Sequence, residues 1–442
     1  MSSLEITKKD YLNLDFKLVS TCFVISIATQ GFGSSIFGYN IFSDVSTLMV
    51  YLALLIQVAT NTLRFSKILL LIFAFVLIQS FAYNFYNIII VSSLKHFLGL
   101  IIFSISVFSF IAVHRNRIVE IVEIYYKFVF FITCFAILQT LICIFFDPPF
   151  VLTSLFSAIF NPPQTLFEPE ILGIFPRAVG LSTEPAHYAM TALPGAFIAL
   201  LVLTGKNNGI VKSSKTIAWV ILIGLILSFS LVGYFGLMLC LIAVFGSNLK
   251  GRLLPTITVT LFFIGALFFV SQSNLMSKLT TIPAMVSGAG DYAYTSSDLT
   301  GFALVSNILV ANEGLKKSHY LGTGINTHKD TYDETIYNQF SSSQVLVEVN
   351  KQDAGSLFIR LPSEFGIPGL LAFLLFFYHY KIGKGFKPSP IKTINLMSLV
   401  VLISYSSRNG GYLLVQLWFF AALFYYTYRV QQSQIKIVQS GQ

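Results

Sequence analysis

Apolar runs long enough to cross a membrane recur along almost the whole of this 442-residue chain. An α-helix rises 1.5 Å per residue, so about 20 apolar residues span the roughly 30 Å of hydrocarbon in a bilayer. We therefore predict an all-α integral membrane protein with about twelve transmembrane helices. The predicted spans are 18–35, 45–60, 68–84, 94–113, 127–146, 183–204, 216–230, 232–247, 253–271, 364–380, 393–405 and 412–428.

The composition excludes a water-soluble globule. Hydrophobic residues make up 55% of the chain and charged residues 11%, and the mean hydropathy is +0.76. A soluble domain needs roughly a quarter of its residues charged. The net charge of +9 is spread over short loops without a basic patch interleaved with aromatic residues, so we expect no nucleic-acid partner.

The cysteines predict neither a disulfide framework nor a metal cluster. Cys22, Cys134, Cys143 and Cys240 all fall inside apolar runs, where a thiol behaves as a small hydrophobic group. The acidic residues of the segment after the ninth span have no regular ligand spacing. We expect no bound metal.

The distribution of basic residues predicts the orientation. Lys and Arg are retained in short cytoplasmic loops, and in this chain they gather in alternate connections, as at 114–127, 205–215 and 381–392. This pattern favours cytoplasmic positions for both termini. It also places two long segments on the other side: a proline-rich loop at 147–182 and a larger loop at 272–363. The chain thus divides into spans 1–9 (1–271), a large loop or cap (272–363) and spans 10–12 with a tail (364–442).

The first group of candidate functional residues lies where the 147–182 loop enters the sixth span. It comprises Arg177, Gly180, Glu184 and His187. Charged groups at a membrane edge are costly to desolvate unless they pair or meet a ligand, and a guanidinium suits phosphate oxygens. One reading is a structural Arg177–Glu184 pair; the other is an anion site. His187 is either a base or, as we favour, an interfacial hydrogen-bonding residue.

The second group lies in and after the large loop. Gly322 and Gly324 would let backbone N–H groups approach an anion, although such a pair of glycines is more often a simple turn. Arg360 and Glu364 are four residues apart, which fits either an ordinary helical ion pair or a second cation facing the same chamber as Arg177. Lys317 and His319 add a small basic cluster, which usually means solvated surface.

With these residues in view, the chain resembles the superfamily of O-antigen polymerases and O-antigen ligases, bacterial membrane glycosyltransferases with a GT-C-like arrangement. An Arg-x-x-Gly before a Glu-Pro resembles the stretch from Arg177 to Pro185. A Leu-Gly-x-Gly resembles 321–324, and a Glu-x-Gly-Ile-x-Gly-Leu resembles 364–370. Ligase relatives have a His followed by Asn in the large loop, whereas Lys329 follows His328 here, which favours a polymerase.

The resemblance implies a reaction in which a sugar hydroxyl attacks an oligosaccharide carried on undecaprenyl diphosphate, at the periplasmic face of the bacterial inner membrane and without a metal or other cofactor. It implies that Arg177 and Arg360 contact the diphosphate and that Glu184, His319 and Glu364 are candidates for base or acceptor-positioning roles. Further implied partners are a chain-length regulator and a flippase. The implied substrate-binding residues are Gly180, His187, Gly322, Gly324 and Lys317.

Two other functions stay open. A lipid-linked oligosaccharide flippase or other transporter has a similar composition, although a transporter is expected to carry ionisable residues deep within its spans and to have related halves. An O-antigen ligase is the second alternative. We expect a polymerase because the candidate charges gather beside the two long outer loops.

Overall fold

The computed structural model describes residues 8–29, 34–36, 39–42, 45–84, 90–146, 169–171, 175–182, 184–245, 299–340, 350–383 and 386–440. Helices dominate this part of the chain, and the strands form two short antiparallel pairs, β1 with β2 and β3 with β4. The first helices are α1 (Lys8–Ala28), α2 (Val45–Ala59), α3 (Lys67–Asn84), α4 (Ile90–Val113), η1 (Arg115–Arg117) and α5 (Ile118–Phe146). They are followed by α7 (Pro185–Leu203), α8 (Lys215–Leu227), α9 (Leu231–Phe245), α12 (Leu299–Lys317), α13 (His328–Phe340), α14 (Leu357–Tyr380), α15 (Pro390–Arg408) and α16 (Val415–Ser440). The strands are β1 (Ser34–Ile36), β2 (Tyr39–Phe42), β3 (Pro169–Ile171) and β4 (Phe175–Pro176).

A helix covers most of each predicted span within the described residues. The prediction of 18–35 is wrong at its end, because α1 stops at Ala28 and Ser34 and Ser35 belong to strand β1. The predicted span 253–271 lies outside the described residues. Among the residues that the structure describes, four helices are long and apolar enough to cross a bilayer, and four shorter apolar helices accompany them. The four long stretches are Ser93–Val113, Arg115–Phe145, Pro185–Leu203 and Leu357–Tyr380. The fold is that of a helical membrane protein, and the number of spans stays a prediction.

Several helices extend past the apolar runs. Helix α5 begins at Ile118 rather than 127, and its first turns are held because Ile118, Ile121 and Tyr125 are buried in the core. Helix α14 begins at Leu357, where the Ser356 hydroxyl accepts a hydrogen bond from the Phe358 amide as an N-cap. Hydropathy finds only the lipid-compatible part of a helix, so these polar or protein-covered turns were missed.

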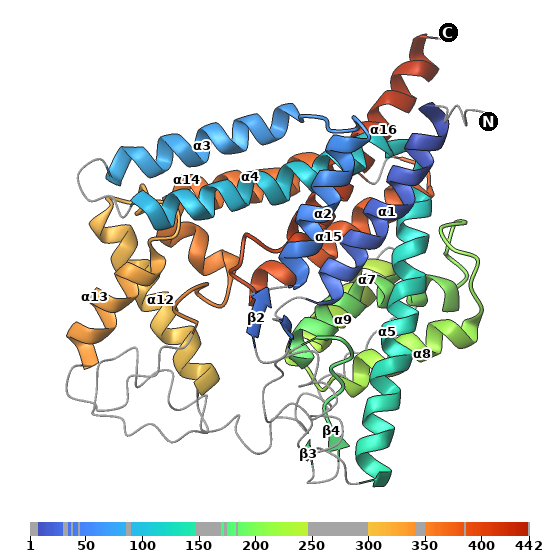
Figure 1. Cartoon of the computed structure of the whole chain (residues 1–442), viewed down its shortest axis with the longest axis horizontal. Coiled ribbons are helices and arrows are strands. Elements are labelled where there is room, and N and C mark those ends of the chain that lie inside the picture. Colours follow the sequence, from blue (N-terminus) through green and yellow to red (C-terminus); the bar gives the residue numbers. More distant parts are fainter. Residues whose placement is uncertain are drawn as a thin grey trace.

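The helices are not one parallel bundle. Figure 1 shows α3, α4 and α14 running together along the long axis of the molecule, while α1, α2 and α5 cross that direction steeply. Helices α7, α9 and α15 pack on one another, and α8 packs against α5 and α7, to the right of α5 in Figure 1. Helix α7 lies at the centre of the core, because 78% of its apolar window is buried within the protein.

Small residues allow the central helices to approach closely. A Cβ atom at Gly195 of α7 would come within 2.5 Å of the Val129 side chain on α5, and one at Gly224 of α8 would collide with Thr133. Membrane helices use glycine in this way because dispersion contacts replace the hydrophobic effect between apolar helices in lipid. This close packing of α5, α7 and α8 holds α7 in place, and Glu184 and His187 lie at the N-terminal end of α7.

The large predicted loop contains two helices, α12 and α13, which lie at one end of α3 and α14 (Figure 1). Val310 on α12 packs with Tyr332 and Ile336 on α13 in a small separate apolar cluster. Helix α12 also packs along α14. The segments 253–298 and 341–349 lie outside the described residues.

Candidate functional site

The site is built around a kink in α14. Gly366 has φ +66° and ψ −167°, a conformation open essentially to glycine alone, and it divides α14 into an N-terminal part with Arg360 and Glu364 and a long apolar part. Gly322 lies directly against this kink, because a Cβ at either glycine would collide with the backbone of the other segment. The Ile367 amide donates to the Tyr320 carbonyl at 3.0 Å. The 318–328 loop is thereby seated on α14.

Arg360 and Glu364 form a buried ion pair. Arg360 Nε donates to Glu364 Oε1 at 2.8 Å, and the two side chains are 4% and 0% exposed. The remaining guanidinium nitrogens donate to the Gly410 carbonyl at 3.1 Å, the Tyr412 hydroxyl at 3.1 Å and Asn326 Oδ1 at 3.4 Å. The guanidinium carbon also lies 4.1 Å from the centre of the Tyr412 ring. Arg360 is therefore engaged on all sides by the protein.

Backbone hydrogen bonds tie the loop to the same pair. The Asn326 amide donates to Glu364 Oε2 at 2.9 Å and the Gly324 amide to the Glu364 carbonyl at 2.7 Å. The Gly322 amide donates to the Ser318 hydroxyl at 2.9 Å. The two glycine amides thus bind protein acceptors, as in the simple-turn interpretation of this motif. Any contact of these residues with a substrate stays a prediction.

His328 is enclosed beneath the loop. Its Nε2 lies 2.9 Å from Asn307 Oδ1 and its Nδ1 2.9 Å from the Ser363 hydroxyl. Because the Asn307 amide nitrogen donates to the Ala303 carbonyl, the partners fit a neutral ring protonated on Nε2. Burial, aided by the nearby Arg360 charge, lowers the pKa of His328 to about 3. The neutral ring of His328, on α13, therefore connects α12 and α14 through its two hydrogen bonds.

The first predicted group lies at the N-terminal end of α7. The Ala178 amide donates to the Leu227 carbonyl at 3.0 Å, which holds the half-buried Arg177 beside the end of α8. Gly180 has φ +59° and packs against the Tyr188 ring, and its carbonyl accepts from Gln139 Nε2. Gly180 therefore forms the tight turn that leads the chain from Arg177 into α7.

Glu184 and His187 lie at the start of α7. Glu184 is the N-terminal cap residue, and its carboxylate is exposed. The half-buried His187 ring is acted on by the charges of Glu184, Arg408 and Asp353.

Asp353 lies in the turn before α14, where its carbonyl packs against Gly410, the residue whose own carbonyl accepts from Arg360. Its charge influences both His187 and Arg360. Sequence reasoning missed Asp353 and Arg408. A signal for Arg408 was present, since it is an arginine in the short connection between the last two predicted spans, on the side where basic residues are disfavoured.

Lys317 and His319 lie apart from the buried network. Both are exposed at the C-terminal end of α12, and Lys317 pairs with Glu334 of α13. His319 occupies a turn with φ +49°. These positions fit a solvated surface, and a role in acceptor binding stays a prediction.

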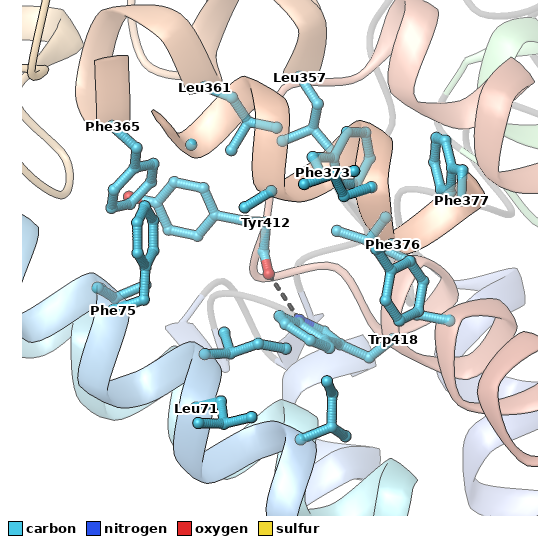
Figure 2. Close-up of a pocket in the computed structure, with 18 of the residues that line it drawn as sticks. Leu71, Phe75, Leu357, Leu361, Phe365, Phe373, Phe376, Phe377, Tyr412 and Trp418 are labelled. Atoms are coloured by element: carbon cyan, nitrogen blue, oxygen red, sulfur yellow. Dashed lines mark hydrogen bonds between the residues drawn. The ribbon is translucent and has the colours of Figure 1, made fainter. Parts of the chain in front are cut away.

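An apolar cavity of about 490 Å³ adjoins the buried ion pair. It lies between α3, α14 and α16, and Figure 2 shows Leu71 and Phe75 facing Leu361, Phe373 and Trp418 across it. Leu71 and Leu375 are 68% and 61% exposed, so the cavity opens at the protein surface. Its size is within the roughly 300–1,000 Å³ of typical ligand sites.

Tyr412 joins the cavity to the polar region. Its ring lines the cavity, its hydroxyl accepts from Arg360 and its carbonyl accepts from Trp418 Nε1 at 2.8 Å (Figure 2). The apolar cavity and the buried Arg360–Glu364 pair therefore meet at one residue. That combination suits an amphiphile with an apolar tail and a polar head group.

Within the described residues, no three His, Cys, Asp or Glu side chains come together as a metal site. Comparison with known proteins gives no match for this chain among family models, curated proteins or solved structures. Function is therefore argued from the geometry of the site.

Proposed function

We propose that the protein is a metal-independent glycosyltransferase that polymerises oligosaccharide units carried on undecaprenyl diphosphate. The observation that carries this proposal is the meeting of the open apolar cavity and the charged region at Tyr412. A polyprenyl tail requires an apolar binding cavity that is open to the lipid, and a diphosphate requires cationic side chains beside it.

The reaction transfers the growing chain from its carrier to an acceptor hydroxyl. The hydroxyl oxygen forms a bond to the anomeric carbon, the bond from that carbon to the diphosphate breaks, and the electron pair leaves with the diphosphate. A base removes the hydroxyl proton. Fixed cations stabilise the charge that develops on the leaving group.

The residues divide into contacting and positioning roles. Arg177, half-buried beside the end of α8, is the proposed diphosphate contact. Arg360 and Glu364 are enclosed and act by fixing the 318–328 loop and the Gly410 segment. Glu184 is the proposed base for the acceptor hydroxyl. Its side chain is exposed, so a substrate can reach the carboxylate, and it lies close to His187.

The proposal includes a location. Twelve spans with both termini cytoplasmic would put the α14 N-terminal end and the long loops on the periplasmic face of the bacterial inner membrane. A flippase would deliver the substrate there, and a separate chain-length regulator would limit the product. Both partners follow from the sequence resemblance.

Substitution of Arg177 tests the proposal in the native host. Arg177→Ala should abolish the long-chain ladder of surface polysaccharide on a gel while the protein stays inserted, and Arg177→Lys should retain part of it, because Lys keeps the charge but loses the planar fork. The exposed Arg429 of α16 gives a control, since Arg429→Ala should leave the ladder intact. A normal ladder from stable Arg177→Ala protein contradicts the assignment.

One observation favours a transporter as the second candidate. Asp15 on α1 and His114 at the end of α4 form a fully buried pair 2.9 Å apart, and Asp15 also accepts hydrogen bonds from Thr60 and Thr62. Buried ionisable pairs between membrane helices often serve proton-coupled transport. Vesicles holding only the purified protein decide between the functions: a transporter flips the lipid-linked oligosaccharide, whereas a polymerase does not.

A further inference from the structure

The 318–328 loop connects two helices that face each other across the apolar cavity. It is seated on the kink of α14, and on the opposite side the Gln79 side chain of α3 donates a hydrogen bond to the Leu321 carbonyl. The Phe75 ring of α3 and the Phe365 ring of α14 meet at the same end, with their centroids 6.5 Å apart. The loop therefore spans one end of the cavity from wall to wall.

Ile325 is the residue of this loop whose side chain lines the cavity. The side chain is 3% exposed, and the backbone is held by two further helices' hydroxyl groups. The Ile325 amide donates to the Ser80 hydroxyl of α3 at 3.3 Å, and its carbonyl accepts from the Ser93 hydroxyl of α4 at 3.0 Å. The isoleucine thus presents apolar surface to the cavity from a defined position.

The residues on either side of Ile325 bind the buried ion pair. The Gly324 amide donates to the Glu364 carbonyl at 2.7 Å, and the Asn326 amide donates to Glu364 Oε2 at 2.9 Å. Arg360 donates to Asn326 Oδ1 at 3.4 Å. These three consecutive residues therefore contact the cavity and the ion pair at once.

The opening of the cavity lies among lipid-compatible side chains. Leu71 of α3 and Leu375 of α14 line it and are 68% and 61% exposed, and both belong to apolar helices. What enters between them from a bilayer is a hydrocarbon chain. Such a chain adds dispersion contacts to every side chain that lines the cavity, and Ile325 is one of them.

We propose that Ile325 couples binding of the carrier's polyprenyl tail to the position of the 318–328 loop. This inference rests on the proposed function, which places the tail in the cavity, and it adds a positioning residue that lies outside the charged groups. A tail packed against Ile325 must be stripped away before the loop can leave α14. Occupancy of the cavity therefore stabilises the loop together with its hydrogen bonds to Glu364.

The test is amide hydrogen exchange of the purified full-length protein in phosphatidylcholine nanodiscs, with and without undecaprenol. Undecaprenol should slow exchange in the 318–328 loop roughly 10-fold, because opening of the loop then also exposes the surface of Ile325 that the tail covers. Exchange in the 205–215 connection should not change. The nanodisc lipid supplies acyl chains in both samples, so the difference reports the polyprenyl chain alone.

Occupancy of the cavity is measured separately. The chain has two tryptophans, and Trp418 lines the cavity whereas Trp219 is 56% exposed on α8. In Trp219→Phe protein, undecaprenol that carries a nitroxide group should quench the fluorescence of Trp418. This signal shows that the tail is bound, whether or not the loop responds.

Substitutions within the loop assign the effect to one side chain. Ile325→Ala should still permit quenching of Trp418 but lose most of the slower exchange, and Ile325→Val, which removes a single methyl group, should keep part of it. Leu321→Ala is the matched control. Leu321 lies in the same loop, is 49% exposed and does not line the cavity, so this variant should respond to undecaprenol like the wild type.

Two results overturn the inference and leave the proposed function standing. One is quenching of Trp418 in wild-type background without slower exchange in the loop, and the other is a full response from Ile325→Ala protein. Absence of quenching overturns both, because the tail then lies elsewhere. A loop that responds through Ile325 in a protein that never polymerises a lipid-linked oligosaccharide refutes the proposed function alone.

Discussion

An arginine's chemistry is decided by what already surrounds it, and Arg360 is an example. Arg360 donates to four different residues and is 4% exposed, so its charge is balanced within the protein. Such an enclosed side chain is suited to positioning other groups rather than to contacting a ligand.

Removal of Arg360 should destabilise the protein strongly. Arg360→Ala would leave Glu364, which is 0% exposed, as a buried carboxylate without its counter-charge, at a cost of about 3–5 kcal/mol. Denaturation of the purified variant in detergent measures the loss. Arg429→Ala, an exposed change on α16, should stay within about 0.5 kcal/mol of the wild type. An Arg360→Ala loss below about 1 kcal/mol would contradict the buried pair.

His328 should make stability depend on pH. Its pKa of about 3 in the folded state lies below the roughly 6.5 of an unfolded histidine, so protons bind the unfolded chain more readily between these values. The stabilisation is complete above about pH 6.5 and falls on acidification, by up to about 2 kcal/mol at pH 5. His328→Gln should remove this part of the pH dependence.

The control for that experiment is the exposed His379. His379→Gln also deletes a titratable ring, yet it should keep the wild-type loss of stability between pH 7.5 and pH 5. If His328→Gln and the wild type lose the same free energy of unfolding over that interval, the buried neutral ring of His328 does not cause the loss of stability on acidification.

At the scale of elements, the kink in α14 organises the site. It brings the 318–328 loop against the N-terminal part of the helix, where the Glu364 carbonyl accepts from the Gly324 amide and the Glu364 carboxylate from the Asn326 amide. The same kink leaves the long apolar half free to line the cavity. One irregular residue, Gly366, therefore links the polar and apolar parts of the site.

Gly366→Ala should disrupt this junction. Alanine at φ +66° and ψ −167° costs about 1–3 kcal/mol in backbone strain, and its Cβ would also collide with the Tyr320 carbonyl. We expect a lower melting temperature and loss of polymer. Gly383→Ala is the matched control, because a Cβ there meets nothing within 4 Å. Equal stability of the two variants would contradict the close packing at the kink.

The sequence predicted elements better than the contacts between them. Apolar runs located the helices well, because hydropathy reports lipid-compatible turns directly, yet the extensions of α5 and α14 were missed. The spacing of four residues offered an Arg360–Glu364 ion pair as one of two interpretations, and the structure contains that pair. Its enclosure by Asn326, Gly410 and Tyr412 was not, since long-range contacts leave no local pattern. The predicted span at 253–271 lies outside the described residues.

Across the whole molecule, an open apolar cavity adjoins a buried ion pair. The cavity between α3, α14 and α16 (Figures 1 and 2) opens at the surface, and its inner wall reaches Tyr412. The Tyr412 hydroxyl accepts a hydrogen bond from Arg360 of α14. Helices far apart in the sequence thus contribute to one site.

Filling the cavity should block the carrier without unfolding the protein. Ala372 lines the cavity, so Ala372→Trp should weaken undecaprenol binding and shorten the polysaccharide ladder. Leu371 is 52% exposed on the same helix and does not line the cavity, so Leu371→Trp should have little effect. Unaltered binding by Ala372→Trp would show that the tail lies elsewhere.

The most direct test of the central claim is polymerisation by the purified protein alone. Proteoliposomes containing it should convert an undecaprenyl-diphosphate-linked oligosaccharide into a ladder of longer products in the presence of a chelator, and Arg177→Ala protein should not. A single unextended band from wild-type protein that binds the lipid-linked substrate would contradict the account.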